Sequence, residues 1–366
     1  MTLEKIREEA SDNISRLDNP ESIRTPGRTW TRYPEDLEEK ASKAENLEPS
    51  IESSGDIEIF QGEEAVDKAG NKLFELIRPD ENRLNAVHAM YMNSVIYVAA
   101  SGESELHVKY ESDGPVLSHL IVEASDNSSV TVTEETSSEE FNSSFTEIYV
   151  GENATVEYGA VENTEGFSYS RRKAITDDYG TINWLNGIFD GELNRTKIES
   201  ILKGDDSETE MTGVWYPVKE QHHDISLHAR HIGDRTRCNM DSRSVVDHRA
   251  RSLYEGLQKV ETGAVDTSSF QDQETLMLSD KAESDASPKL MIEDPNVEAS
   301  HAAAAGTVEE DKQHYLESRG LPEDKSERLV VKGFFEPVME EITVPAVKER
   351  IREEVQKKLD AKTEEN

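Results

Sequence analysis

Residues 105–135, ELHVKYESDGPVLSHLIVEASDNSSVTVTEE, alternate apolar and polar side chains and interrupt this alternation at Asp, Gly, Asn and Ser. Alternation of this kind is typical of strands with one buried face, and the interruptions are typical of turns. The same pattern runs from about residue 55 to 290, almost without helical periodicity. It therefore predicts a mainly β domain.

Three β architectures fit a long series of short strands: a sandwich, a barrel and a β-solenoid. No exact short repeat is visible, which argues against the solenoid. The length of the unbroken strand pattern argues against the sandwich, because a solenoid grows by adding turns and a single sandwich core does not. The residue pattern alone leaves the choice open.

Both flanks of the strand region are predicted to be helical. The first segment, TLEKIREEASDNISRL, has apolar residues at roughly helical spacing, with Thr2 as the expected N-cap. After DPNVEASH the chain is expected to become helical again. The last helix carries an apolar stripe at four-residue spacing, which suits docking on one surface: Val347, Ile351, Val355 and Leu359.

The composition excludes several classes of partner. The chain has 366 residues, of which 77 are acidic and 40 basic, for a formal net charge of −37. So negative a surface repels phosphate backbones and acidic lipids, which argues against nucleic acid and membranes as partners. The acidic residues are spread along the chain, which favours adaptation to high salt. No apolar stretch reaches membrane-span length and the N-terminus lacks a signal-peptide core, so a cytoplasmic protein is expected.

Histidines are concentrated in QHHDISLHARH. On a strand, His222, Asp224 and His228 would share one face and could bind zinc or iron. His223 and His231 would lie on the opposite face. The alternative is a set of stacked or surface histidines with no metal.

Cys238 is the only cysteine, so neither an intrachain disulfide nor a cysteine-based zinc site can form within one chain. The neighbouring Arg235 and Arg237 could lower its thiol pKa and make it reactive. A cysteine on a strand is more often a small, inert buried residue.

His301 stands in MIEDPNVEASHAAAAGTVEED, after an acidic stretch and before a run of alanines. Alanine is too small to fill space alone, so another segment is expected to pack closely there. A neutral imidazole is a good iron ligand. With no cysteine nearby, an iron cluster at this position would need ligands from a second chain.

Motifs for catalysis are weak. No nucleophile elbow, phosphate-binding loop or metalloprotease helix appears in the sequence. Acid-rich segments such as GESELHVKYESDG could pair two carboxylates for glycoside hydrolysis, as in β-solenoids that act on polysaccharides. With 77 acidic residues, such pairs also arise by chance.

Four segments follow one another in order over about residues 80–345: LNAVHAMYMNSVIYV, then QHHDISLHARH, then SLYEGLQKVETGAVDTSSFQDQETLMLSDKAESDASPKLMIEDPNVEASHAAAAG, then YLESRGLPEDKSERLVVKGFF. Asp224 stands seven residues before His231 in the second of them. In this order and combination the segments resemble the SufB/SufD scaffold proteins of iron–sulfur cluster assembly.

The resemblance implies a right-handed parallel β-helix core at residues 56–292, between an N-terminal helical region at 1–55 and a C-terminal helical domain at 293–366. It implies that the segment 307–345 docks the ATPase SufC, and that strands near 240–301 pair with a second scaffold subunit. The chain would be a non-enzymatic scaffold that pairs with SufB or with itself. A transient iron–sulfur cluster would form at the subunit interface, with no cofactor bound tightly to the isolated chain.

The local match is nearer to SufD, because this chain has SHAAA where SufD-like proteins have SHGAT. The resemblance assigns a part in cluster assembly to His301. Glu274 stands where SufB has a cysteine and is a second candidate iron ligand. Cys238, at a position usually held by a small residue, is the third. The other functions considered are a carbohydrate-active β-solenoid enzyme and a purely structural SufD paralogue.

Overall fold

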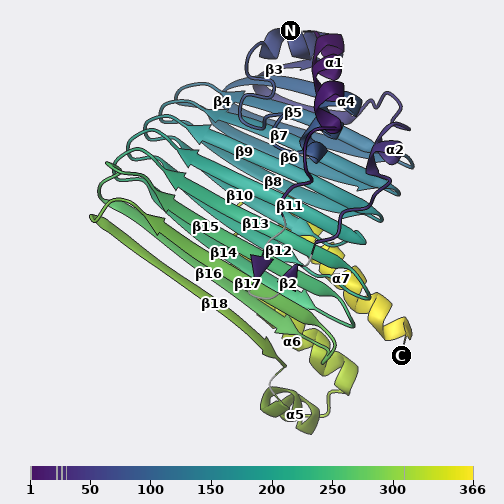
Figure 1. The fold of residues 1–366 in the computed structure, drawn as a ribbon. Coiled ribbons are helices and arrows are strands. Elements are labelled where there is room, and N and C mark those ends of the chain that lie inside the picture. The colour runs from purple at the N-terminus through teal and green to yellow at the C-terminus, as the bar shows by residue number, and fades with distance from the viewer. Residues whose placement is uncertain (1, 22–23, 26–27, 30, 309, 366) are drawn as a thin grey trace.

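The chain coils into a stack of strands with two faces (Figure 1). The computed structural model describes residues 2–21, 24–25, 28–29, 31–308 and 310–365. Strand β4 (Ser94–Ser112) begins the coil and pairs with the first strand of each of two sheets. The odd-numbered sheet contains β5 (Val116–Ala124), β7 (Phe141–Val150), β9 (Phe167–Thr176), β11 (Leu193–Leu202), β13 (His222–His231), β15 (Arg251–Val260) and β17 (Glu283–Ile292). The even-numbered sheet contains β6 (Ser129–Ser138), β8 (Thr155–Thr164), β10 (Thr181–Ile188), β12 (Glu208–Trp215), β14 (Arg237–Val246), β16 (Thr267–Met277) and β18 (Val297–Thr307).

Every strand from β5 onward pairs in parallel with strands one turn away, so the fold is a mainly β parallel solenoid. The expected parallel β-helix with helices at both ends is confirmed. Each early turn takes 26 residues, since Val116 faces Asn142. Later turns are longer, with Leu193 opposite His222 and Arg251 opposite Glu283. Because turn length drifts and most residues differ between turns, the repeat was not visible in the sequence.

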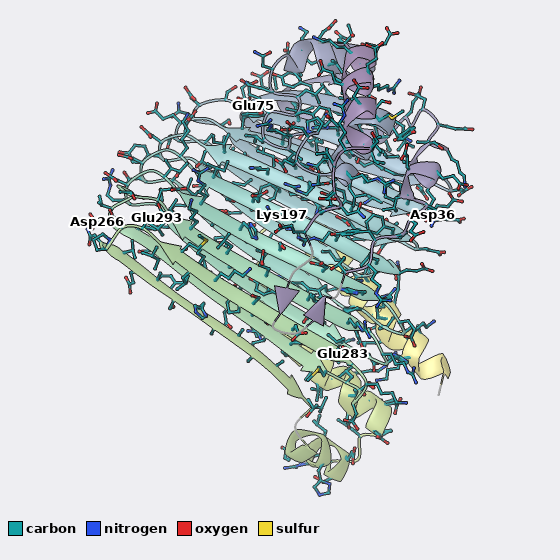
Figure 2. All side chains as sticks on the ribbon, viewed as in Figure 1. Asp36, Glu75, Lys197, Asp266, Glu283 and Glu293 are labelled. Atoms are coloured by element: carbon teal, nitrogen blue, oxygen red, sulfur yellow. The ribbon has the colours of Figure 1, made fainter. Side chains whose placement is uncertain are left out.

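One corner of most turns contains a residue with positive φ. These residues are Asn127, Asn153, Tyr179, Asp206, Arg235 and Asp266. Each donates its backbone N–H to a carbonyl of the following turn, as Asn127 does to Glu152 at 2.9 Å. Asn and Asp tolerate this conformation better than most residues, which explains their frequency between the strands. Figure 2 shows Asp266 at this corner, beside Glu293.

The core of the solenoid lies between the two sheets. Alternate residues of each strand point inward and are buried there, which is the alternation seen in the sequence. Large aromatic side chains fill the later turns, and their polar atoms have partners. Trp184 donates from Nε1 to Ser200 at 2.9 Å, and Trp215 donates to Ser252 at 2.8 Å.

The N-terminal segments cover the outer face of the odd-numbered sheet and close the first turn. They comprise α1 (Leu3–Ile14), β1 (Arg24–Thr25), β2 (Arg28–Thr29), α2 (Leu37–Ala41), β3 (Ser50–Gln61), α3 (Gly62–Ala69) and α4 (Arg83–Tyr91). Strand β3 pairs antiparallel with β4, and the helices pack on aromatic residues of β7 and β9. Thr2 caps α1 as expected, accepting the N–H of Lys5 at 3.4 Å.

Helices α3 and α4 lie inside the region where almost no helix was expected. Most residues of α4 are buried, from Leu84 to Ala89 without interruption. A short helix that is buried on several sides has no polar face, so the 3.6-residue apolar period that marks a surface helix is missing.

The C-terminal helices are α5 (Glu310–Ser318), α6 (Glu323–Glu341) and α7 (Pro345–Glu365). Helices α6 and α7 cover the outer face of the even-numbered sheet, whereas α5 lies below the last turn and contacts α6 (Figure 1). The expected stripe of α7 is confirmed, since Val347, Ile351, Val355 and Leu359 are all buried against the sheet. In the part of the chain that the structure describes, no helix is long and apolar enough to cross a membrane.

The run of alanines after His301 is a strand and not the start of a helix. Residues Val297–Thr307 form β18, which pairs in parallel with β16. Ladder pairing here overrides the high helix propensity of alanine. The ladder therefore continues beyond residue 292, although the expected division into domains at that point stays a prediction.

Candidate functional site

The last turn of the solenoid ends in two open strand edges. Strands β17 and β18 stand at opposite ends of the strand order, and each pairs with only one other strand in the described part of the chain. Most residues of β18 are exposed, and those of β17 are exposed or half-buried. Met291 and Ile292 on β17 are large apolar residues with 49% and 42% exposure. A long exposed edge with apolar side chains is a template for pairing with another chain.

His301 lies on this open edge. It pairs in register with Gln271, whose side chain is buried between the sheets, so His301 lies over the end of the core. His301 and the four alanines that follow are exposed. The expectation that another segment packs closely on the run therefore stays a prediction, because the run is exposed in the described single chain. The small side chains leave room for a second polypeptide.

Glu274 lies one strand away from His301 but on the other face. It pairs with Ala304, three positions further along β18 than His301, and residues three apart on a strand point to opposite faces. Its carboxylate accepts a hydrogen bond from Nη1 of Arg243 at 2.9 Å. Glu274 also lines a cavity of about 850 Å³ that includes Leu329 and Phe334 of α6. Within one chain the two candidate ligands do not meet.

Cys238 lies on β14, two turns below the open edge. It pairs with Ser269, which in turn pairs with Ala299. The side chain is buried, and burial raises the pKa of its thiol to about 12. The thiol is therefore neutral at ordinary pH, which does not suit a nucleophile or metal ligand in this state.

The histidine-rich strand β13 has the alternation that the sequence predicts. His222, Asp224 and His228 lie on its outer side, and His223 and His231 point inward. Asp224 is nevertheless fully buried, and it and His228 make ion pairs. Asp224 accepts hydrogen bonds from Arg195 at 2.8 Å and from Thr31.

His228 contacts Glu255 at 3.0 Å between Nε2 and Oε1. Among the described residues there is no group of three or more His, Cys, Asp or Glu side chains placed to hold a metal ion. The trio on β13 is therefore not arranged as a metal site in the described part of the chain.

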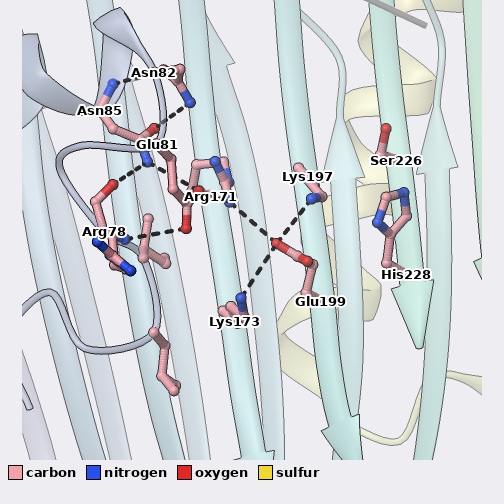
Figure 3. A network of polar contacts seen from close by, with 12 residues as sticks. Arg78, Glu81, Asn82, Asn85, Arg171, Lys173, Lys197, Glu199, Ser226 and His228 are labelled. Carbon is pink, nitrogen blue, oxygen red and sulfur yellow. Dashed lines mark hydrogen bonds and ion pairs between the residues drawn. The ribbon is translucent and has the colours of Figure 1, made fainter. Parts of the chain in front are cut away.

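A cluster of basic residues on β9 and β11 was not found from the sequence. Figure 3 shows Arg171, Lys173 and Lys197 around the carboxylate of Glu199, at 3.2, 4.0 and 3.1 Å. Arg195 lies next to them on β11. The available signal was the pair of segments SYSRRKA and LNRTKIE, each with basic residues two apart. Seeing it required knowing that these segments occupy adjacent turns.

Comparison with known proteins agrees with this architecture. The family model "SUF system FeS cluster assembly, SufBD core domain" matches residues 107–334. The iron–sulfur cluster assembly protein SufD of Bacillus subtilis is 30% identical over 261 residues, covering 67% of this chain and 60% of that protein. SufB of the same organism is 22% identical over 296 residues, covering 75% and 63%.

A SufBD family protein of Mycobacterium bovis is 28% identical over 186 residues, covering 50% of this chain and 22% of that protein. The matched regions thus span less than two thirds of each of these relatives. The family model covers more than half of this chain and coincides with the solenoid and α6. The chain therefore belongs to the SufB/SufD family of iron–sulfur cluster assembly proteins, and within it is SufD-like.

Proposed function

We propose that the chain is a non-enzymatic scaffold subunit that pairs with a SufB-like subunit, or with a second copy of itself, through the last turn of its solenoid. The observation that carries this proposal is the exposed double edge formed by β17 and β18. Pairing along these edges would satisfy the free backbone groups and cover Met291 and Ile292. An iron–sulfur cluster would assemble at this interface as cargo.

His301 is the ligand that this chain would contribute. Its imidazole is exposed on β18, in the middle of the edge that would face the partner. Glu274 is the second candidate, and it would reach a shared site only from the outer face of the sheet. One histidine cannot hold a cluster, so the remaining ligands, thiolates above all, would come from the partner.

We further propose that the C-terminal helices dock a SufC-type ATPase. The cavity of about 850 Å³ between β16, β18, α5 and α6 supports a docking role, because it joins the last turn directly to the helices. Tyr315 and Leu329 on α5 and α6 are large, exposed side chains at this cavity. Nucleotide-driven movement of these helices would then reach β16 and β18 and alter the open edge.

The test is coexpression with candidate SufB and SufC subunits, followed by light scattering and by assays of iron and sulfide. The wild-type chain should form a complex. Ala303→Glu combined with Ala305→Glu should abolish scaffold pairing, because it places two carboxylates in the interface. Ser137→Glu, at an exposed position on β6, should leave pairing intact.

His301→Ala should preserve the complex and lower its iron and sulfide content several-fold, whereas His107→Ala on β4, in the first turn, should leave both unchanged. If the chain remained a monomer and bound neither SufB nor SufC, the proposed scaffold function would be contradicted. Unchanged iron with His301→Ala would instead indicate a purely structural SufD paralogue.

A further inference from the structure

The outer face of the odd-numbered sheet carries four basic residues on two neighbouring strands. Arg171 and Lys173 project from β9, and Arg195 and Lys197 project from β11. Arg171, Lys173 and Lys197 surround the carboxylate of Glu199 (Figure 3). Arg195, on the same face, pairs with Asp224 at 2.8 Å. In a chain with a net charge of −37, four basic residues so close together are a local concentration of positive charge.

The close placement of these positive charges is unfavourable for the stability of the fold. Lys197 lies directly opposite Arg171 in the register of β9 and β11, and like charges at that position are destabilising. Both side chains are largely covered, with 24% and 6% exposure. Burial, together with Arg171 and Arg195, lowers the pKa of Lys197 below its ordinary value, despite Glu199. Buried groups perturbed in this way are concentrated at functional sites.

These side chains line a cavity of about 700 Å³ over the sheet. Its floor includes Arg171, Arg195 and Lys197, and its far side includes His228 and Lys289. Residues 16–21 of the N-terminal segment form part of the wall. The volume is in the range of small-molecule sites. Figure 2 shows Lys197 near the middle of this face of the sheet.

The cations on the floor retain hydrogen-bond donors beyond their internal ion pairs. An ammonium has three donors, and among the described residues the ion pair of Lys197 is with Glu199, at 3.1 Å. A guanidinium has five donors, and the hydrogen bonds of Arg195 to Asp224 and Ser226 both leave from Nη1. The two side chains are adjacent outward positions of one strand, so their remaining donors converge on the same part of the cavity.

We propose that this cavity binds a small oxyanion ligand, one that carries phosphate or carboxylate groups. Arginine and lysine bind such groups through charge-assisted hydrogen bonds, which are the strongest kind available here. Four carboxylates also line the cavity, those of Asp18, Glu21, Glu81 and Glu255, so the ligand has to contact the basic residues between them. The site lies on the face of the sheet, away from β18 and His301, and in the described part of the chain it reaches the open strand β17 only through Lys289.

Calorimetric titration of the full chain with inorganic pyrophosphate and with citrate tests the site. At least one probe should bind with a dissociation constant below about 1 mM. Preference for pyrophosphate would assign a phosphate-bearing ligand, and preference for citrate a carboxylate ligand. Lys197→Met should weaken binding about tenfold or more, because a charge-assisted hydrogen bond is lost.

Lys203→Met is the matched control. It removes a lysine that pairs with Asp177 on the exposed surface, 59% exposed, and should leave binding unchanged. Lys289→Met, at the far side of the cavity, is a second variant that removes a side chain 46% exposed and paired with Glu255, and it should weaken binding about threefold. Absence of binding to either probe, or equal binding by wild type and the two cavity variants, would overturn the proposal.

Discussion

The first and last turns of the solenoid differ in how their strand edges are covered. At the first turn, β3 pairs antiparallel with β4 and helix α3 packs beside both strands. At the last turn, β17 and β18 each end the ladder, with side chains that are exposed on β18 and exposed or half-buried on β17. An open strand edge can pair with a strand of another chain. This chain covers the edges of its first turn with its own segments and leaves those of its last turn open, so the last turn is the end that a partner can reach.

The largest expected effect is on the reaction rate of the Cys238 thiol. This rate measures how well the turns next to the open edges exclude solvent. Burial raises the pKa of its thiol to about 12, and the thiolate is the reactive form. At pH 8, Cys238 should therefore react with an aromatic disulfide reagent about a thousandfold more slowly than an exposed cysteine whose pKa is about 8.5. The absorbance of the released thiol measures the rate.

Ala303→Cys in a Cys238→Ser background is the exposed control, since position 303 lies on β18 itself. It should react within the time expected of a free thiol. Equal rates at the two positions would mean that the last turns unfold locally as a unit. The first and last turns would then differ in local stability and not only in how their strand edges are covered.

The next effect tests what holds the covered end closed. Glu147 on β7 is fully buried and accepts backbone N–H groups from Phe74, Leu76 and Ile77 at 2.7, 2.6 and 2.9 Å. Oε2 of Glu147 also contacts Nε2 of His119 at 2.9 Å. Glu147→Gln removes the charge that attracts these donors and should lower the free energy of unfolding by about 3 kcal/mol, as measured in urea.

Glu75→Gln provides the comparison, because Glu75 is exposed and bonds to the hydroxyl of Tyr149. Its effect should stay within about 0.5 kcal/mol. If Glu147→Gln were as mild as this control, the loop at residues 74–77 would be held by its apolar contacts, and the carboxylate would not be the anchor of the covered end.

Acid should weaken the later turns through buried histidines. His231 on β13 lies between the hydroxyls of Thr236 and Ser269, at 2.8 and 3.0 Å, and burial lowers its pKa to about 4. The unfolded chain binds this proton below pH 6.5, whereas the folded chain binds it only near pH 4. This contribution to stability is therefore complete above pH 6.5 and is lost as pH falls to 4, by up to about 3 kcal/mol.

Urea unfolding at several pH values measures this dependence. His231→Gln should make the decline with acid less steep, and His314→Gln on the exposed surface of α5 should leave it as in the wild type. An unchanged slope in His231→Gln would place the acid sensitivity elsewhere.

The features that the sequence predicted correctly are those encoded over a few neighbouring residues. Alternation along each strand predicted the inward and outward sides of β13, and four-residue spacing predicted the buried stripe of α7. The family resemblance then selected the solenoid, which residue spacing left open. Periodicity reports how one element meets its neighbours, and this is why it succeeds where the element has one buried side.

The candidate site was harder to predict because it depends on register between turns. His301 and Glu274 are close in the ladder, yet three positions of offset place them on opposite faces. The pairing of Arg171 with Lys197 spans 26 residues of sequence, and the turn length changes along the chain. These offsets cannot be predicted from neighbouring residues of the sequence. The basic cluster is therefore recognised only in the folded structure, where the pairing of the strands is known.

The smallest predicted effect concerns helix α7, which covers the outer face of the even-numbered sheet at the early turns. Gly159 on β8 faces α7, and a Cβ at this position would lie 2.3 Å from Cγ2 of Val347. Gly159→Ala should push the helix outward and lower stability by about 1–3 kcal/mol. It should also make α7 more accessible to protease than in the wild type.

Gly114→Ala is the matched substitution, because the nearest atom to its Cβ would be Oγ of Ser112 at 3.7 Å and its φ is not positive. This change should leave stability within about 0.5 kcal/mol. Alanine is intrinsically better than glycine within a strand, so a helix that packed only loosely on β8 would make Gly159→Ala neutral or stabilising. That result would show that α7 is a detachable cover, and that the early turns are held closed by the N-terminal segments alone.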